Sequence, residues 1–565
     1  MASFADLSAE LVEQIISYIH YQDTLHALLH ICRSLYTLVV PYLYRNVDLS
    51  IRRNKKVPRI DSFLYLVMGN PKYLKHVESL RVGLARVGGL KEGPRYLPKL
   101  SGPQHCKLIE LLSKEPWIME DDLLHEAILS GCCGAFATVL ILSLPSLRCL
   151  EVSDYSNGTL GELFRFLQRR SPSFVREMAL PSPSALSLIS SLQEVYHNVD
   201  KCTGVRYADR QSHVQLRSFF FLPEVRKLEF FIPDGEPDSI TRSHPRLHGP
   251  SFSHRDHIDS SSITTIVIRY TSCALLHLSG ILRATPQLQS LTCDNWYDLR
   301  TTRAYEDINS PWLNMWKWNK HLKLVKNTPR TLVLGVEFYD SRKSFFRQPS
   351  FEHKYYVGDL DLTEFEKLET LEVPMPCLSG DPRFSIFTMF EPRLPPNLRH
   401  ISLRSDMSRA QFAFQFNARK IVREDSLEST LEDARHDAGA RMDLSYIFRS
   451  ALLLLECPTE LESLSTWQPA ESTWAWVDRQ LEDLTMAGRN KSIAIKVIYP
   501  MLLRLKKPEH WNLVKEVTLF DPSYPGRKAI EKLIRGERGG GLPLGLAMQY
   551  HLNELLAGHV LGADV

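Results

Sequence analysis

A short apolar motif that recurs along most of the chain is the feature that most constrains its fold. The motif consists of an apolar residue, two other residues, an apolar residue, one other residue and an apolar residue. A chain built on such a repeat is expected to stack similar units, each burying its apolar side chains against the next. Weaker copies lie at Leu332 and Leu334 and at Leu461 and Leu464. The clear copies are Val77, Leu80, Val82; Leu147, Leu150, Val152; Val225, Leu228, Phe230; Ile263, Ile266, Ile268; Leu288, Leu291, Cys293; Leu368, Leu371, Val373; Leu398, Ile401, Leu403; and Val514, Val517, Leu519.

The spacing within the motif predicts a short strand. Its last part alternates apolar and other residues, as a strand with one buried face does, and the spacing before it suits a turn that packs a leucine beneath the strand. Helical patterns lie between the motifs at 161–170, 185–198 and 275–283. We therefore expect an α/β protein in which strands and helices alternate and the strands form a parallel sheet.

The recurrence favours an irregular leucine-rich repeat solenoid that spans residues 76–525. Regular repeats of this kind recur every 20 to about 29 residues, whereas the middle apolar residues of these copies are mostly farther apart. Long insertions are expected at 233–262, which is rich in Pro, Ser, His and Asp, and at 404–491, which is largely helical. A single copy reads equally well as an ordinary core strand of an unrelated α/β fold, but similar flanks around many copies favour the solenoid.

Residues 1–50 have a different pattern, with apolar residues three and four positions apart. This spacing predicts two amphipathic helices, over 7–19 and 25–36, with Ser8 and Asp23 as their N-caps. A third short helix is expected over 34–40, and Pro41 is expected to discourage its continuation. A basic linker and a first helix follow at 51–75, and 526–565 holds a C-terminal helix, over 546–560, that caps the repeat domain or folds on a partner.

The N-terminal pattern resembles the F-box family, and the whole chain resembles the large fungal group of F-box proteins. The resemblance rests on spaced apolar residues, a Glu-Leu pair, an Asp-Leu step, a Cys-Arg pair and a later Pro-x-Leu-Tyr-Arg. Ser8 departs from the family, which usually has proline there. The matching residues are Leu7, Glu10, Leu11, Ile15, Ile19, Asp23, Leu25, Cys32, Arg33 and the segment from Pro41 to Arg45.

The resemblance implies a substrate-recognition subunit of a cullin-RING ubiquitin ligase of the Skp-cullin-F-box type. Such a protein binds the Skp adaptor through its F-box and a protein substrate through its repeat domain, and it needs no catalytic site of its own. Periodicity does not distinguish residues that contact the adaptor from residues that face inward, and Cys32 suits packing at least as well. The candidate adaptor-binding residues are Leu7, Glu10, Leu11, Ile15, Ile19, Leu25, Leu28, Cys32 and Leu35.

Three alternatives remain open on the sequence alone. Residues 7–49 could be a helical cap of a larger domain, because so short a segment buries little surface by itself. The chain could be a scaffold that binds the adaptor, or another protein, outside ubiquitination. It could also be an enzyme whose site is assembled from distant residues.

Composition narrows the class of partner and the compartment. The chain has 68 basic and 65 acidic residues, too balanced for the broad basic footprint of nucleic-acid binding. Its ten cysteines form no CxxC pair, which fits a reducing compartment. The N-terminus does not resemble a secretory signal, and no apolar run is long enough for a membrane span, so a cytoplasmic or nuclear location is expected. The basic residues at 52–59 fit a nuclear import signal or a solvated linker.

Motifs for catalysis or metal binding are weak. No GxSxG, GxxxxGK[ST] or strand-linked GxGxxG occurs, and the sequence His254, Arg255, Asp256 lacks the asparagine that a kinase loop needs at position 261. Four histidines at 244, 248, 254 and 257 are not completed to a metal-site pattern by a cysteine or by a tightly spaced set of carboxylates. We therefore expect no metal and no cofactor. Trp312, Trp316 and Trp318 could be interface anchors or fill the core.

Overall fold

A computed structural model gives two compact units. The first contains the described residues up to Phe230 together with 261–263, and the second contains Phe231 and the residues from Thr264 on. The structure describes residues 7–19, 21–51, 59–84, 102–152, 189–197, 219–220, 222–231, 261–271, 274–298, 311–339, 351–385, 389–410, 427–457, 460–469, 476, 478–500, 513–526 and 530–535.

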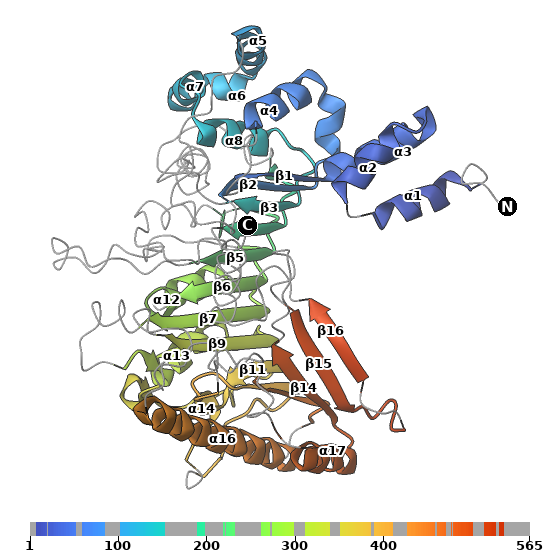
Figure 1. Cartoon of the computed structure of the whole chain (residues 1–565). Coiled ribbons are helices and arrows are strands. Elements are labelled where there is room, and N and C mark those ends of the chain that lie inside the picture. Colours follow the sequence, from blue (N-terminus) through green and yellow to red (C-terminus); the bar gives the residue numbers. More distant parts are fainter. Residues whose placement is uncertain are drawn as a thin grey trace, which may run out of the picture. The chain divides into compact units, whose positions relative to one another are not determined.

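The first unit combines helices with five short strands (Figure 1). The strands follow one another in the sheet in chain order, and every neighbouring pair is parallel. The elements are α1 (Ala9–Ser17), α2 (Gln22–Leu29), α3 (Arg33–Arg45), β1 (Asn46–Ile51), α4 (Ile60–Gly69), η2 (Pro71–His76), β2 (Ser79–Leu84), α5 (Gly102–Leu112), α6 (Pro116–Met119), α7 (Asp122–Leu129), α8 (Cys133–Leu142), β3 (Cys149–Val152), β4 (Glu194–His197) and β5 (Lys227–Phe231).

The second unit opens with strand–helix alternation and closes with antiparallel strands. Its described elements begin with β6 (Thr265–Thr271), α12 (Ala274–Ala284), β7 (Ser290–Asp298), β8 (Leu313–Asn314), α13 (Met315–Leu322), η7 (Lys323–Val325), β9 (Thr331–Tyr339), η9 (His353–Tyr355), β10 (Tyr356–Val357), β11 (Thr370–Pro374) and α14 (Met375–Ser379). They continue with β12 (His400–Arg404), α16 (Leu427–Glu456), β13 (Ser463–Trp467), α17 (Asp478–Lys491), β14 (Ala494–Pro500), β15 (Leu513–Phe520) and β16 (Ile530–Arg535).

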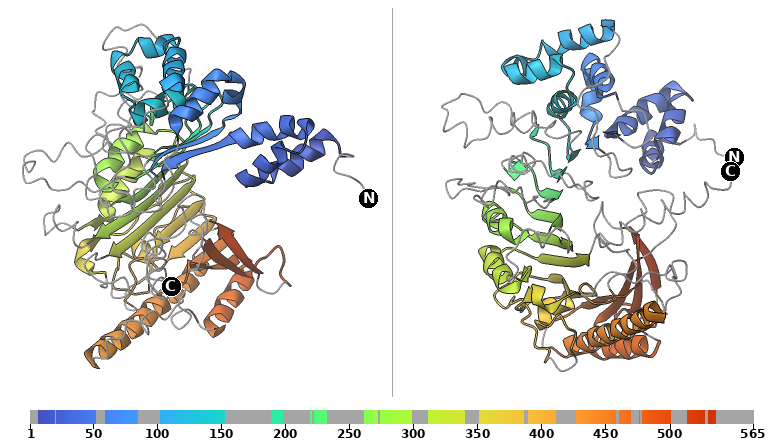
Figure 2. Two further views of the ribbon diagram at one scale, coloured as in Figure 1. Left: turned by 45° about the horizontal axis from the view of Figure 1, so that its top comes forward. Right: turned by 60° about the vertical axis from the view of Figure 1, so that its left-hand side comes forward.

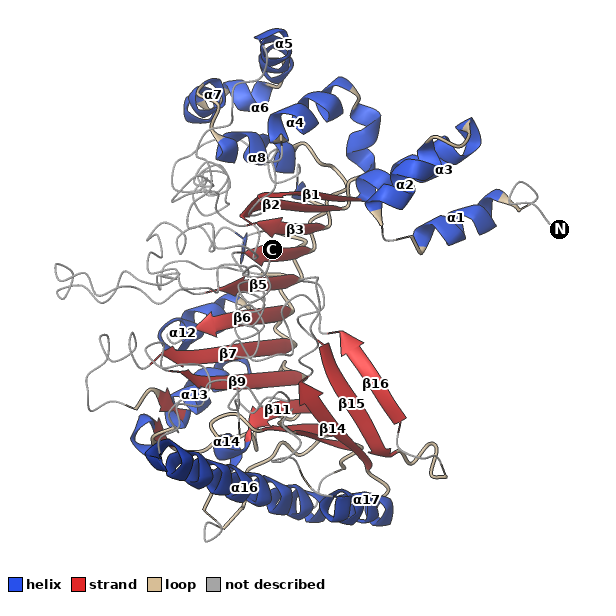
Figure 3. Cartoon of the chain, in the orientation of Figure 1, coloured by secondary structure: helices blue, strands red, loops and turns tan. Residues whose placement is uncertain are grey.

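The sheet of the second unit is mostly parallel. Strands β6, β7, β9, β11, β12, β13 and β14 are parallel neighbours in that order, while β15 and β16 are added antiparallel (Figure 3). A separate parallel pair joins β8 to β10. Both units are therefore α/β, and parallel strands form most of the described sheet. Figure 2 shows α12 and α13 beside one another on one side of the strands of this unit.

The motif predicted from the sequence sets the register of the parallel strands. In the first unit Leu80 faces Leu150 across the ladder, and Val195 lies between Leu150 and Leu228. In the second unit the same position is held by Ile266, Leu291, Leu332, Leu371, Ile401, Leu464 and Ile495. All of these side chains are buried, so each strand continues the apolar layer of the strand before it.

In most described parallel strands one backbone carbonyl ties the strand to the next. It belongs to the residue two positions before the middle apolar residue, and we call it the shared carbonyl. Glu78 O accepts hydrogen bonds from the amides of Arg148 and Cys149 at 2.8 and 3.0 Å. Thr264 O accepts from Gln289 and Ser290 at 2.8 and 2.9 Å. The same double acceptance occurs at Arg148, Gln193, Gln289, Arg330, Glu369 and Arg399.

The face opposite the apolar layer carries charged residues whose partners lie on neighbouring strands. In the second unit Arg269 Nη1 lies 2.5 Å from Asp294 Oδ2. Arg404 donates to Glu372 at 2.7 Å and to Asp406 at 2.8 Å, although it is almost fully buried. Gly335 lies between these groups, because a Cβ there would be 2.8 Å from Asp294 Oδ1. The buried charges of this face are therefore paired, and removing one partner would leave an uncompensated buried charge.

Several local predictions are corrected by the structure. The second helix ends at Leu29, with Tyr21 as the N-cap of α2 and Asp23 inside its first turn. Helix α3 continues through Pro41 to Arg45, because Val39 is buried and Tyr42 and Leu43 pack against the same apolar cluster. Packing thus outweighs the hydrogen bond that the proline cannot donate.

Other corrections concern strands. The described part of the predicted helix at 185–198 contains β4, since Gln193 and Glu194 donate to the shared carbonyl of Arg148. The copy at Val514, Val517 and Leu519 lies in β15, which is antiparallel to β14 and outside the parallel register. Strand β1 was not predicted at all.

Two predicted segments contain strands of the sheet. β13 lies inside 404–491 and pairs with β12 and β14, so the chain returns to the sheet between α16 and α17. β16 lies inside 526–565. The helix predictions at 161–170 and 546–560, the insertion at 233–260 and its histidines, and the basic residues at 52–58 lie outside the described residues.

Substituting Gly488 by alanine is expected to weaken the packing of α17 on β14. A Cβ at this position would overlap Ile495 Cγ1 and lie 2.9 Å from Ile493 O. Alanine is the better helix former by about 1 kcal/mol, but overpacking of this kind costs about 1–3 kcal/mol. Thermal denaturation should therefore show a lower midpoint for Gly488→Ala. The control is Gly69→Ala in α4, where a Cβ would have nothing within 4 Å. An equal drop of the denaturation midpoint in both variants would contradict the close packing of Gly488 against β14.

Asp443 in α16 gives the stability of this unit a pH dependence. Burial raises the pKa of its carboxyl from 3.8 to about 6, although it accepts a hydrogen bond from Arg409 N at 2.8 Å. The folded chain therefore holds this proton at pH values where the unfolded chain releases it, and this contribution is lost as pH rises from about 4 through 6. We expect Asp443→Asn to become more stable relative to the wild type across this window, by ~2–3 kcal/mol. Urea unfolding of both proteins at pH 4, 5, 6 and 7 measures their free energies of unfolding. A difference between the two proteins that stays constant with pH would contradict the prediction.

A candidate protein-docking surface on the N-terminal helices

The three N-terminal helices have a small apolar core of their own. Val12, Ile16, Leu25, Leu35 and Val39 are buried together. The half-buried residues packed against this cluster are Leu7, Ile19, Leu28, Leu29, Leu38, Tyr42 and Leu43. The side of α1 that carries Val12 and Ile16 therefore faces the core, and Ile19 just after the helix packs against it.

Helix α1 begins where the sequence predicts. The Ser8 hydroxyl accepts a hydrogen bond from Leu11 N at 3.4 Å, which confirms Ser8 as the N-cap. Glu10 lies exposed in the first turn, and hydrogen bonds from its own backbone amide and from Ser8 lower the pKa of its carboxyl. A negative charge at this end of a helix also interacts favourably with the helix dipole. The helix is thus fixed at its start without using its exposed apolar side chains.

Helix α1 also carries an exposed apolar row, which we call the α1 row: Leu11, Ile15 and Tyr18. Their exposed fractions are 49%, 42% and 72%. The residues are four and three positions apart, so they lie on one side of the helix, next to the buried side. Three large exposed apolar residues in a row are unusual on a soluble surface and are typical of a surface that contacts another protein.

The structure divides the predicted adaptor-binding residues into three groups. Leu25 and Leu35 are buried in the core, and Leu7, Ile19 and Leu28 are half-buried against it. Leu11, Ile15, Glu10 and Cys32 are exposed. Cys32 is the N-cap of α3 and not a packing residue. Only the exposed group is free to contact a partner directly.

The sequence reasoning missed four exposed apolar residues of this region. Tyr36 lies in α3, whereas Tyr18, Tyr21 and Ile31 lie at helix ends or between helices, so the helical pattern gave no signal for these three. Tyr36 places its hydroxyl 3.4 Å from that of Tyr73, so it is held by η2. The four are Tyr18, Tyr21, Ile31 and Tyr36.

A serine, a histidine and a glutamate meet on β12 and β13, but not as a catalytic triad. His400 Nδ1 lies 2.9 Å from Ser463 Oγ, and the two residues are direct partners across the parallel ladder. Glu462 lies 3.8 Å from His400 Nε2, too far for the hydrogen bond that orients a catalytic histidine. The contact is ordinary cross-strand packing.

The cysteine pair at 132–133 lies at the start of α8 and is buried. Burial raises the pKa of the Cys133 thiol to about 12, so it stays protonated and is a poor nucleophile. Among the described residues, no three His, Cys, Asp or Glu side chains gather as metal ligands. Within the same ranges, no helix is both long enough and apolar enough to cross a bilayer.

Comparison of the sequence with models of known protein families finds no match, and comparison with curated proteins finds none either. The candidate site is therefore argued from the geometry of the α1 row and from the helices that hold it.

The division between core and surface in α1 predicts opposite outcomes for two neighbouring isoleucines. Ile16→Ala is expected to lose about 2–4 kcal/mol of local stability, because its side chain is 1% exposed. Ile15→Ala is expected to lose less than about 1 kcal/mol, because Ile15 is 42% exposed. Hydrogen exchange measured on peptides from residues 7–49 compares the two. Equal protection losses in both variants would show that the inward side of α1 is assigned wrongly.

Proposed function

We propose that the chain is a substrate receptor of a Skp-cullin-F-box type ubiquitin ligase, which binds the Skp adaptor through α1–α3. The observation that carries the proposal is the α1 row. Leu11 and Ile15 occupy positions of the F-box resemblance and are exposed, while their neighbours Val12 and Ile16 form the core. The helix therefore folds without the row, and the row remains available for a partner.

Burial energetics supports this role for the α1 row. Covering a large apolar side chain is worth about 1.5–3 kcal/mol, and each residue of the row is only partly covered. A partner that covers Leu11, Ile15 and Tyr18 together gains from all three at once. Cys32 and Ile31, exposed between α2 and α3, offer a second contact for the same partner. Apolar anchors of this kind carry most of the energy of an interface.

The common register of the parallel strands supports the proposal that a repeat domain binds the substrate. The parallel ladders in each unit, the shared carbonyls and the recurring buried middle residue fit an irregular leucine-rich repeat domain. In the proposed function this domain holds a protein substrate near a ubiquitin-charged enzyme. Proximity alone raises the effective concentration of a substrate lysine, so the receptor needs no catalytic residue.

Co-purification of the tagged chain with the Skp adaptor tests the proposal. We expect the wild type to bind and Leu11→Asp, Ile15→Asp to lose binding, because removing one such anchor typically costs about 2 kcal/mol or more. The matched control is Met442→Asp, Leu453→Asp, which places two charges at exposed apolar positions of α16. Circular dichroism should show both double variants folded. A wild type that does not bind the adaptor would refute the proposal.

Recruitment of the cullin distinguishes a substrate receptor from a scaffold that binds the adaptor outside ubiquitination. A receptor is expected to recruit the cullin through the adaptor and to shorten the lifetime of a protein bound to its repeat domain. Reconstitution of the chain with adaptor and cullin, followed by size-exclusion chromatography, measures the first property. Adaptor binding without cullin recruitment would favour the scaffold.

A further inference from the structure

Helix α13 exposes one tryptophan beside two that it buries. Trp312 and Trp318 are 5% and 0% exposed, and Trp312 stacks on Tyr355 with ring centroids 3.9 Å apart. These two tryptophans fill the core. Trp316 is 61% exposed, so it does not contribute to the core in the same way. Large exposed aromatic side chains are typical anchors of protein interfaces.

The Trp316 indole is held in place by a glycine. A Cβ at Gly358 would lie 2.7 Å from Trp316 Nε1 and 2.8 Å from its Cδ1, so the ring rests directly against the Gly358 backbone. Gly358 also has a positive φ of 84°, which favours glycine over other residues. An exposed side chain that is already ordered loses less entropy on binding than a mobile one.

Three exposed cationic side chains lie on α13 and at the end of α12, close to His321. Lys317 and Lys320 are exposed on α13, and Arg283 is exposed at the end of α12. None of the three has an ion-pair partner among the residues that the structure describes. Their combined field is felt at His321: burial is the main cause that lowers the pKa of its imidazole, and Lys320, Arg283 and Lys317 lower it further. A carboxylate brought to this place would be attracted by all three cations.

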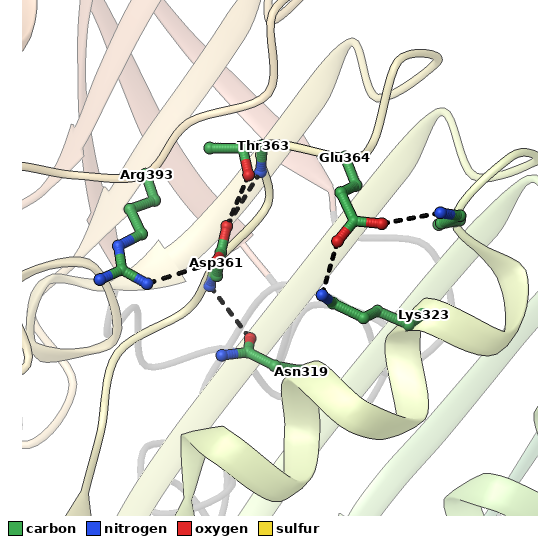
Figure 4. A network of polar contacts seen from close by, with 7 residues as sticks. Asn319, Lys323, Asp361, Thr363, Glu364 and Arg393 are labelled. Atoms are coloured by element: carbon green, nitrogen blue, oxygen red, sulfur yellow. Dashed lines mark hydrogen bonds and ion pairs between the residues drawn. The ribbon is translucent and has the colours of Figure 1, made fainter.

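The cationic surface ends where a glutamate neutralises the next two lysines. Glu364 lies 2.6 Å from Lys323 Nζ and 2.7 Å from Lys326 Nζ (Figure 4). Nearby, Asn319 accepts a hydrogen bond from Asp361 N, and Asp361 pairs with Arg393. Beyond the end of α13, Leu324 in η7 is 45% exposed. The available surface therefore combines two apolar side chains with three cations.

We propose that this surface, formed by Trp316, Lys317, Lys320, Leu324 and Arg283, docks an acidic protein segment that carries an apolar or aromatic side chain. Trp316 and Lys320 are four residues apart on α13, so they share one side of the helix, and the exposed Leu324 follows in η7. An extended or helical segment running along them would place an apolar residue against Trp316 and carboxylates against the lysines and Arg283. This site lies in the second unit and does not depend on adaptor binding by α1–α3.

Charge favours an acidic protein segment over nucleic acid or a membrane. Stable nucleic-acid binding commonly uses about 6–10 phosphate contacts, whereas this surface offers three cations that have no ion-pair partner among the described residues. A membrane surface likewise attracts clusters of about 4–8 basic residues. Three cations on the same surface as an exposed tryptophan match a short acidic stretch with one apolar anchor.

A random twelve-residue peptide library displayed on phage tests the proposal on the full chain. We expect selected peptides to be enriched in Asp and Glu around an apolar residue. The best peptide, synthesised with a fluorescein label, should bind at least tenfold more weakly to Trp316→Ala and to Lys317→Glu, Lys320→Glu. It should also bind more weakly at 0.5 M salt. Competition with single-stranded RNA and with anionic vesicles shows whether either of them binds the surface instead.

Matched variants elsewhere in the second unit control for nonspecific effects. Tyr524→Ala removes another exposed aromatic ring, and Lys532→Glu reverses an exposed charge on β16; both should bind the peptide as the wild type does. Circular dichroism should show every variant folded, because all these side chains are exposed. Selection of neutral or basic peptides, equal binding by all variants, or stronger displacement by RNA or vesicles would overturn the proposal. None of these results depends on adaptor binding.

Discussion

A backbone carbonyl at the start of a parallel strand, accepting two amides from the next strand, is the interaction on which the register of most described parallel strands depends. The amides of Arg148 and Cys149 share Glu78 O, and those of Gln289 and Ser290 share Thr264 O. Because the carbonyl always lies two residues before the middle apolar residue, this contact fixes the strand register. Correct register then places Leu80 beside Leu150 and Leu291 beside Leu332. A shift of one residue would turn every apolar side chain to the charged face.

This constraint acts only where a strand begins, which explains why the spacing between motifs is irregular. The chain leaves the sheet after β12, forms the long helix α16 and returns at β13 with Glu462 and Ser463 bonded to Arg399 O. The cost of closing a longer loop rises slowly with its length. Helices and loops can thus be added between consecutive strands without disturbing the strand register. Helix α13, with Trp316 held by Gly358, is one such addition.

The α1 row and the Trp316 surface share one physical argument. In each case the neighbouring residues complete the local core: Val12 and Ile16 in α1, Trp312 and Trp318 around α13. The exposed apolar residues are therefore not required for folding, and a partner that covers them gains from burying the area that is still exposed. The difference lies in charge, because cations flank Trp316 while the first turn of α1 carries Glu10. The two surfaces accordingly suit different partners.

The sequence by itself determined the class of each element where local pattern and packing agree. The motif strands, the Ser8 cap and helix α12 follow from spacing and capping chemistry alone. It did not determine β1, which pairs along its length with β2, or β4, which begins where Gln193 and Glu194 donate to the shared carbonyl of Arg148, or the passage of α3 through Pro41. For the candidate site, periodicity found the residues of α1 but not which of them face outward. Only the tertiary structure decided that Leu25 and Leu35 are core while Leu11 and Ile15 are surface, because burial depends on what the other helices cover.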